Sequence, residues 1–320
     1  MSAPKLTAKP AETLPVQRIL KEVSRRIVGQ DAMIERLLVG MLTGGHILLE
    51  GVPGLAKTLA VRTLAEIIHA SFSRIQFTPD LLPADVTGTM VFDQKSQEFY
   101  VKKGPLFAQI ILADEINRAP AKVQAALLEA MQEHQVTIGG TTYPLEEPFL
   151  VLATQNPIEN EGTYPLPEAQ LDRFMFELHV DYPTLDEEER IVSTTTSDDT
   201  LSITPVLTAD QLARLQHLVR RLPAPPTVVR YAVKLARSTR PDAAEATADV
   251  KRYVSWGAGP RASQYLVLGA KAKAAMDGRS VPDLDDVRSI ADSVLRHRVV
   301  LNFQGEAEGL SVSKLIRLEE

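Results

Sequence analysis

The chain has 320 residues, which favours two domains because one hydrophobic core rarely serves so long a chain. Its formal net charge of -6 argues against nonspecific binding of the whole chain to nucleic-acid phosphates, although it is compatible with a basic pore in an oligomer. Because the chain has no cysteine, disulfide bonds and thiolate metal sites are excluded.

The N-terminal residues carry no targeting pattern. Residues 1–10 are polar and lack the apolar core of a signal peptide. No apolar run approaches the roughly 18 residues of a membrane span. We therefore expect a loose arm over residues 1–15, no membrane insertion and a cytoplasmic location.

The first predicted elements lead into a glycine-bearing turn. Apolar residues recur at helical spacing over residues 16–26, and residues 27–30 interrupt that pattern. Asp31 is a favourable N-cap for a second helix, which the glycine pair 44–45 ends. An apolar run over residues 46–49 then predicts the strand that feeds the turn.

Beyond the turn, helical and strand patterns alternate, which indicates a doubly wound parallel α/β sheet over residues 16–183. Two nearly continuous apolar runs indicate strands that are buried on both faces of that sheet. Two further segments read as β-hairpins added to this plan. In chain order we predict a helix at 59–68, a strand at 72–77, a loop at 78–85, a hairpin at 89–101, a strand at 106–113, a helix around 123–131, a hairpin at 135–145, a strand at 149–153, a short helix at 169–174 and a strand at 175–180.

The composition changes after residue 183. An acidic helical piece is followed by a Ser/Thr run at residues 193–197, and we place a linker at 184–207. From residue 208 to residue 320 the pattern is helical throughout, so we predict a small all-helical second domain. Its expected helices cover 209–221, 226–239, 260–276 and 284–300.

Residues 51–58 read GVPGLAKT and combine the parts of a phosphate-binding loop. Backbone N–H groups at a helix N-terminus favour an anion, Lys57 would reach the terminal phosphates, and the Thr58 hydroxyl would ligate magnesium. The usual pattern has glycine before the lysine, and Ala56 fits only if its φ is negative, as the start of a helix requires. The alternative is an ordinary Gly/Pro turn. The expected contacts are Gly51, Val52, Pro53, Gly54, Leu55, Ala56, Lys57, Thr58 and Leu59.

An acidic pair follows the apolar strand that ends at residue 113. Ligands of parallel sheets bind at the carboxyl ends of the strands, where Asp114 and Glu115 lie. Hydrolysis of a nucleoside triphosphate needs a carboxylate near the metal and a group that orients the attacking water. Asp114 is the candidate for the metal and Glu115 for the water. Read alone, the pair is also an ordinary charged strand end.

Three more polar residues are candidates for the same chemistry. Asn156 ends the next buried strand and could sense the γ-phosphate, or it could be a turn residue before Pro157. Arg173 is either a structural ion-pair arginine or one that stabilises transition-state charge across a subunit boundary. Arg261 begins a helix of the second domain, where a merely solvated side chain is the alternative. The six histidines show no ligand spacing, so we assign no metal site to them.

These motifs together resemble an AAA+ ATPase, and within that class the MoxR family. The resemblance covers residues 16–303, and Ala56 is itself usual in MoxR proteins. It implies that Ile27, Val28, Gly29 and Gln30 contact adenine. It also implies that the Walker A motif with Lys57 and Thr58, and the Walker B motif with Asp114 and Glu115, bind ATP and magnesium. The remaining motifs that carry the resemblance are LADEINR at 112–118, ATQNP at 153–157, EAQLDRF at 168–174 and GPR at 259–261.

The resemblance also implies the roles of the remaining site residues. Asn156 would be sensor 1, Arg173 an arginine finger acting in trans and Arg261 sensor 2, in its own subunit or a neighbour's. The two hairpins match the helix-2 insert and the pre-sensor-1 hairpin of this branch.

From the resemblance we expect a magnesium-dependent ATPase that forms a hexameric ring and remodels or matures a protein client, with a von Willebrand factor A domain partner. One rival is a nucleic-acid motor resembling minichromosome-maintenance helicases, which the acidic charge disfavours. A second is the ATPase subunit of a magnesium-chelatase-like complex. A third is a nucleotide-gated scaffold, which the presence of Glu115 and Arg173 disfavours.

Overall fold

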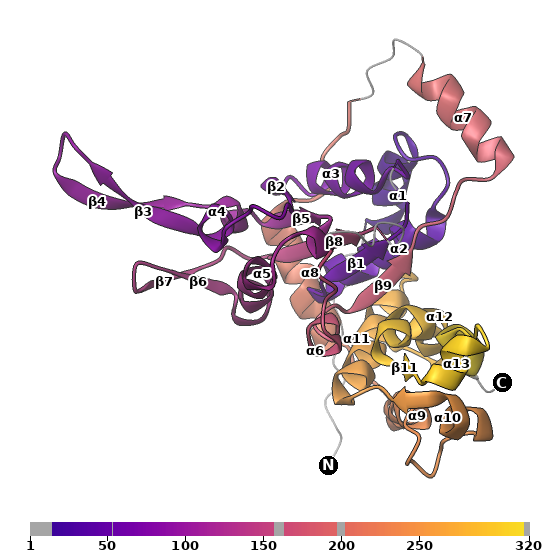
Figure 1. The fold of residues 1–320 in the computed structure, drawn as a ribbon. Helices are drawn as coiled ribbons and strands as arrows, with labels where there is room; N and C mark the ends of the chain where they lie inside the picture. The colour runs from indigo at the N-terminus through magenta and orange to yellow at the C-terminus, as the bar shows by residue number, and fades with distance from the viewer. Residues whose placement is uncertain (1–14, 53, 157–162, 197–201, 317–320) are drawn as a thin grey trace, which may run out of the picture.

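The computed structural model describes residues 15–52, 54–156, 163–196 and 202–316. Its centre is a five-stranded sheet in the order β2-β5-β8-β1-β9, and every neighbouring pair of strands is parallel (Figure 1). This order confirms the predicted doubly wound parallel sheet. The strands are β1 (Ile47–Glu50), β2 (Phe72–Gln76), β5 (Ile110–Asp114), β8 (Leu150–Gln155) and β9 (Phe176–His179).

Alternating side chains of the strands build a hydrophobic core on each face of the sheet. Ile47 and Leu49 of β1 pack with one core, and Leu48 between them packs with the other. The first core includes α1 (Val16–Ser24), α2 (Asp31–Thr43) and α3 (Lys57–Ile67), and the second includes α5 (Ala121–Glu133). Both faces are therefore covered, as the continuous apolar runs predicted.

Several predicted boundaries differ from the structure. The run at 106–113 is a strand only from Ile110, because Pro105–Phe107 forms a 3-10 helix before it. The expected loop at 78–85 contains the start of α4 (Pro83–Thr87), whose N-terminus Asp85 caps through the backbone N–H of Leu82. Asp31 is the first residue of α2 rather than its N-cap, because Gln30 takes the cap position with a φ of 60°.

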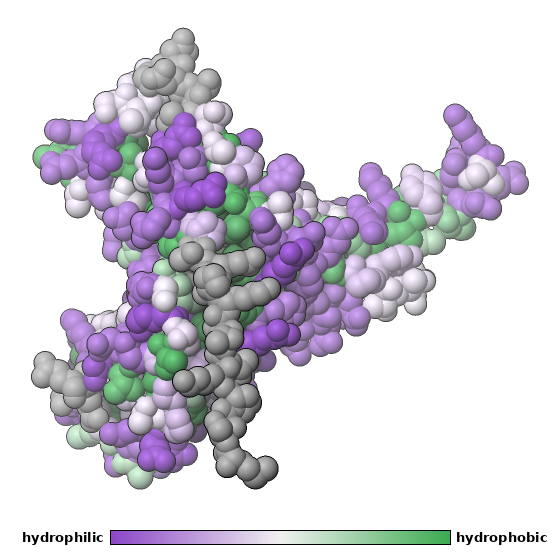
Figure 2. Space-filling view, turned by 180° about the vertical axis from the view of Figure 1, so that it is seen from behind, coloured by the Kyte–Doolittle hydropathy of each residue, from purple (hydrophilic) through white to green (hydrophobic). Residues whose placement is uncertain are grey.

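Two hairpins leave the sheet as predicted. The longer one pairs β3 (Gly88–Asp93) with β4 (Glu98–Lys103), and the shorter one pairs β6 (Gln135–Ile138) with β7 (Thr141–Pro144). Figure 1 shows both projecting from the same side of the body. Figure 2 shows hydrophobic side chains along the longer arm. On this hairpin the ring centroids of Phe92 and Phe99 lie 5.1 Å apart, and the two residues are 49% and 66% exposed.

The chain beyond residue 183 is mostly helical, with one addition. The predicted acidic helical piece is α7 (Leu185–Thr195). A short antiparallel pair, β10 (Val254–Trp256) and β11 (Val300–Leu301), corrects the expectation of an all-helical second domain and of a helix running to residue 300. The domain boundaries themselves stay a prediction. The helices are α8 (Ala209–Arg221), α9 (Pro226–Ser238), α10 (Ala248–Tyr253), α11 (Pro260–Met276), α12 (Leu284–Leu295), α13 (Phe303–Ala307) and α14 (Val312–Leu315).

The second helical region packs directly on the sheet region. Leu266 of α11 and Ile290 of α12 are fully buried in the core that also holds Leu49 of β1. Asp172 adds a polar anchor, because it accepts hydrogen bonds from Arg261 at 2.9 Å and from Arg298 at 2.8 Å. The Arg298 side chain is only 1% exposed, whereas that of Asp172 is 32% exposed, so the ion pair is buried on the arginine side and reached by water on the carboxylate side.

Candidate nucleotide site

The loop between β1 and α3 adopts the shape that a phosphate loop needs. Gly54 has a φ of 88°, a conformation that glycine adopts without steric cost. Gly51 is needed for a different reason, since a Cβ there would lie 2.7 Å from the backbone oxygen of Val180. The helix that follows begins at Lys57, so its N-terminal N–H groups lie at the end of the loop.

Ala56 departs from our expectation. Its φ is 55°, so it lies in the left-handed region and not at the negative φ that we required. An alanine in that region costs roughly 1–2 kcal/mol more than in a right-handed helix, and glycine avoids this cost. The glycine of the usual pattern is therefore explained by backbone geometry, and this chain tolerates the strain at the residue before α3.

Lys57 is held by its own loop. Its Nζ donates a hydrogen bond to the backbone oxygen of Gly51 at 2.5 Å. Partial burial lowers the pKa of the ammonium group, and the nearby carboxylates of Asp114, Glu115 and Glu50 oppose that shift. The cation therefore faces the two carboxylates at the end of β5 across the loop.

Thr154 of β8 orders the acidic pair at the end of β5. Its hydroxyl donates to Asp114 Oδ1 at 2.6 Å and accepts from the backbone N–H of Glu115 at 2.9 Å. One hydroxyl therefore fixes both the carboxylate of one residue and the backbone of the next. We did not single out Thr154 from the sequence, although it stands two residues before Asn156 in the motif at 153–157.

Two polar side chains of β2 reach the same acidic pair. Arg74 donates to Asp114 Oδ2 from Nε at 3.0 Å and from Nη2 at 2.5 Å, and Gln76 donates to Glu115 Oε2 at 2.9 Å. The parallel register explains the second contact, because Gln76 lies beside Asp114. Our sequence reasoning missed both residues, and only their alternation with apolar neighbours in the strand could have indicated them.

Glu115 occupies a strained position. Its φ of 55° places it in the left-handed region, which carries a cost for any residue other than glycine. Arg118 donates to its Oε2 at 3.0 Å, and Gln76 donates to the same oxygen. The Glu115 carboxylate is thereby held between β2 and the turn after β5, and the residue lines the same cavity as the loop.

The predicted groups meet in one cavity of about 380 Å³. The loop, the acidic pair and the end of β8 all line it, so Asn156 joins Asp114 and Glu115 there. Pro53 lies outside the described residues, and Gly51 and Val52 do not line this cavity. The lining residues are Gly54, Leu55, Ala56, Lys57, Thr58, Leu59, Arg74, Asp114, Glu115, Thr154, Gln155 and Asn156.

Val28, Gly29 and Gln30 also lie outside this cavity, in the turn between α1 and α2. Gln30 Nε2 donates to the backbone oxygen of Asp181 at 2.9 Å. Asp181 follows Val180, which packs against Gly51 at the start of the phosphate loop. The turn is thus attached next to the loop, and its contact with adenine stays a prediction.

Neither predicted arginine reaches the cavity of its own subunit. The backbone oxygen of Arg173 accepts from the Tyr265 hydroxyl at 3.3 Å, while its guanidinium makes no hydrogen bond or ion pair with the residues that the structure describes. The guanidinium of Arg261 is bound to Asp172. The structure therefore brings together the loop, the acidic pair and Asn156, and it leaves the arginines apart from them.

The donor set fits a magnesium–nucleotide complex. Magnesium prefers oxygen ligands, and the Thr58 hydroxyl and the Asp114 carboxylate both line the cavity. The N-terminus of α3 and the ammonium group of Lys57 supply positive charge for phosphates. Sheet order, loop and strand-end carboxylates together define the class as a P-loop nucleoside triphosphatase.

Comparisons with known proteins narrow this class. Residues 46–176 match the family model of the ATPase family associated with various cellular activities (AAA), and residues 246–317 match that of the AAA lid domain. The chain is 48% identical to "Chaperone MoxR1" of Mycobacterium tuberculosis (strain ATCC 25618 / H37Rv), over 94% of this chain and 80% of that protein. It is 41% identical to YeaC of Bacillus subtilis (strain 168), over 94% of this chain and 91% of that protein.

A solved structure agrees with these relatives. A protein from Cytophaga hutchinsonii ATCC 33406 superimposes with a TM-score of 0.88 at 47% identity, over 94% of this chain and 92% of that one. The chain belongs to the MoxR family of AAA+ ATPases, as the sequence motifs predicted. It is therefore an ATPase that binds a nucleotide. Among the helices that the structure describes, none is long and apolar enough to cross a membrane.

Proposed function

We propose that this ATPase uses magnesium-dependent ATP hydrolysis to remodel or mature a protein client. The observation that carries this proposal is the convergence of Lys57, Thr58, Asp114 and Glu115 on one cavity. The name of the relative from M. tuberculosis, a chaperone, supports a protein client. The cytoplasmic location stays a prediction from the sequence.

The chain's own residues suggest how the proposed reaction proceeds. Lys57 would leave the Gly51 oxygen and turn toward the terminal phosphates. Thr58 and Asp114 would hold magnesium, which would neutralise phosphate charge. Glu115 accepts a proton from the attacking water, and Asn156 orients that water or the phosphate. Gln76 and Arg118 hold the Glu115 carboxylate in the geometry that the structure shows.

We propose that the subunits form a hexameric ring and that Arg173 acts on a neighbour's nucleotide. Two facts support this assignment: the arginine does not line its own cavity, and its guanidinium has no partner among the described residues. Arg261 is proposed as sensor 2. Because it joins Asp172, one residue before Arg173, a movement of the lid would displace the finger.

The partner and the client remain proposals from family resemblance. MoxR-like proteins work with von Willebrand factor A domain proteins, and such a domain is the partner that we propose. The projecting hairpin of β3 and β4 exposes Phe92, Phe99 and Tyr100, which suits contact with the apolar surface of a protein client.

A trapped complex tests this function. The Glu115→Gln variant would be incubated with ATP and magnesium in an extract of the source cells, which should hold it in the ATP-bound state. The variant would then be isolated, and the proteins that remain bound to it would be identified. We expect a client protein to stay bound to the variant, and we expect the wild type to release that client when it hydrolyses ATP. The proposal would be contradicted if client binding did not depend on the nucleotide. It would also be contradicted if DNA, and not protein, stimulated ATP hydrolysis.

A further inference from the structure

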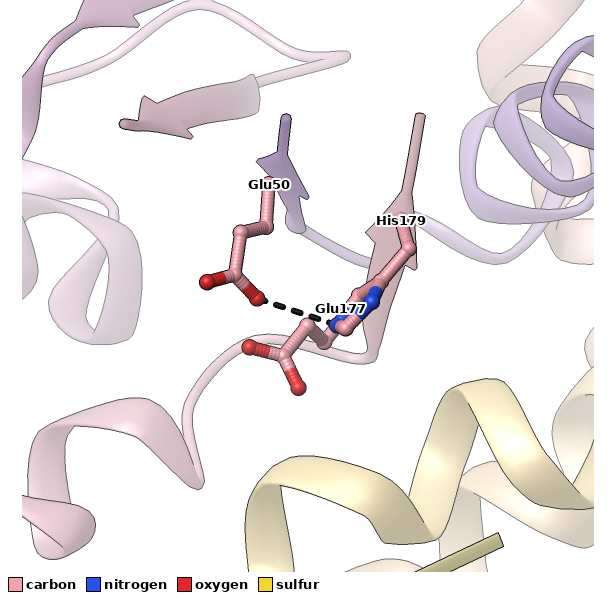
Figure 3. Close-up of side chains that lie close together, drawn as sticks. All are labelled: Glu50, Glu177 and His179. Carbon is pink, nitrogen blue, oxygen red and sulfur yellow. Dashed lines mark ion pairs between the residues drawn. The ribbon is translucent and has the colours of Figure 1, made fainter. Parts of the chain in front are cut away.

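Three potential metal ligands meet at the carboxyl ends of β1 and β9. In the parallel register Glu50 lies beside His179, and Glu177 lies two residues earlier on the same face of β9. Their ligand atoms all lie within 4.8 Å of one another. Figure 3 shows the two carboxylates and the imidazole turned toward a common point.

The cluster is open to a ligand. His179 Nε2 lies 3.0 Å from Glu50 Oε2, and the side chains are 53% and 25% exposed, so solvent reaches them. The half-buried carboxylate of Glu177 makes no hydrogen bond or ion pair with the residues that the structure describes. Folding has therefore placed a second carboxylate beside a Glu–His pair, where only the charges of Arg296 and His179 offset it among the described residues.

The surrounding charges leave a negative excess at the cluster. Arg296 lies close enough to interact with all three groups, but it forms an ion pair with Asp292 of its own helical segment. Lys57 also lies near Glu50, but it faces the phosphate loop and donates to the Gly51 oxygen. Around the imidazole, the three carboxyl groups of Glu50, Glu177 and Asp292 therefore outnumber the one guanidinium of Arg296.

We propose that Glu50, Glu177 and His179 bind a divalent transition-metal cation of the zinc type. Imidazole with carboxylates suits such a cation, whereas magnesium and calcium prefer oxygen ligands alone. Ligand atoms at about 2.1 Å from one ion lie at most about 4.2 Å from each other, so the cluster has to contract slightly. The exposed side chain of His179 provides this freedom by rotation.

The position of this site connects it to the phosphate loop. Glu50 directly precedes Gly51, the residue that packs against Val180 and whose oxygen holds Lys57. A cation bound by Glu50 and His179 cross-links the strand that feeds the loop to the edge strand of the sheet. It is distinct from the proposed magnesium site, because Thr58 and Asp114 belong to other elements.

Zinc binding to the full-length protein tests the site. Isothermal titration of untagged, nucleotide-free protein with zinc chloride should show one equivalent bound, and cobalt should give visible ligand-field absorption of an imidazole-containing site. Removing a ligand in His179→Ala, or in the isosteric Glu177→Gln, should lower the zinc affinity by at least roughly tenfold. Circular dichroism checks that both variants are folded.

Two variants act as controls. His134 Nδ1 lies 2.5 Å from Glu147 Oε1 in an exposed Glu–His pair, which no second carboxylate of the described residues joins to form a three-ligand group. His134→Ala should therefore leave the zinc affinity unchanged. Asp114→Asn removes the proposed magnesium ligand and should also leave zinc binding unchanged. The proposal is overturned if the wild type binds no stoichiometric zinc, or if His179→Ala and Glu177→Gln bind it as tightly as the wild type does.

Discussion

Arg74 of β2 occupies one oxygen of Asp114 with two hydrogen bonds, while Thr154 occupies the other oxygen. Both oxygens of the carboxylate that we propose for magnesium thus already accept hydrogen bonds from protein groups. The Arg74 side chain is 50% exposed, so its ion pair is weak enough to exchange. A metal that binds Asp114 Oδ2 therefore requires the Arg74 side chain to turn away or to share that oxygen with the metal.

Arg74→Ala should lower the magnesium concentration that gives half-maximal ATP hydrolysis. Removal of the arginine frees Asp114 Oδ2, and because an exposed pair contributes up to about 1 kcal/mol, the shift should be at most about fivefold. Arg62→Ala, which breaks the exposed pair of Arg62 and Glu66 on α3, is the matched control and should cause no shift. A higher magnesium requirement in Arg74→Ala would show that Arg74 itself helps to bind the nucleotide.

Glu115→Gln should keep ATP binding and lose hydrolysis. The amide preserves the shape of the side chain but cannot accept the proton of the attacking water, so turnover should fall by about 10²–10⁴-fold. Binding of a fluorescent ATP analogue and steady-state phosphate release measure the two effects. Normal turnover in the variant would remove Glu115 from the mechanism.

Arg173→Ala should reduce hydrolysis only where subunits assemble. The guanidinium lies outside its own cavity, so nucleotide affinity of dilute subunits should stay unchanged. In the assembled state the loss should reach about 10³-fold, the scale of an arginine finger. The measurement is specific activity across a protein dilution series. An equal loss at all dilutions would refute the role in trans.

Asp172→Asn should destabilise the contact between lid and sheet. It removes the negative partner of the buried Arg298 and of Arg261, and we expect a loss of about 1–3 kcal/mol in the free energy of unfolding. The loss stays moderate because Arg298 also donates to backbone oxygens. In the control Asp285→Asn, the lost partner of Arg288 is 84% exposed, so the change in urea denaturation should stay below about 1 kcal/mol.

His46 should make stability depend on pH. Its Nδ1 accepts from the backbone N–H of Val151, so Nε2 carries the proton and donates to the Met131 oxygen, which only a neutral ring can do. Burial lowers its pKa to about 4, so the unfolded chain binds a proton that the folded chain rejects. Stability is present above the ordinary pKa near 6.5 and is lost as pH falls toward 4.

The measurement for His46 is urea denaturation between pH 7 and pH 4. The wild type should lose about 3 kcal/mol from this histidine over that range. His46→Asn should be less stable at pH 7 and should lose correspondingly less on acidification. His217→Asn, at an exposed position of α8, should follow the wild type. Parallel pH curves for all three proteins would contradict the assignment.

Local patterns in the sequence were sufficient for the sheet, the hairpins and most of the cavity. Apolar runs followed by Asp114 or Asn156 predict strand ends, and parallel strand ends meet at one edge whatever the details of packing. Boundaries were less accurate, because Pro105 and Pro83 begin short helices inside segments that read as strand and loop. Such ends depend on single hydrogen bonds and not on periodicity.

The sequence by itself predicted an ATPase, because the phosphate loop and the acidic pair are contiguous motifs with a local physical meaning. Its motifs in combination resemble the MoxR family, and the comparisons with known proteins confirmed that resemblance. Only the tertiary structure decided how these motifs are held: Arg74 and Thr154 reach Asp114 from other strands, and Ala56 takes a left-handed backbone. It also brought His179 to Glu50 across 129 positions of sequence, a contact that comes from the pairing of β9 with β1 and leaves no spacing signal in the chain.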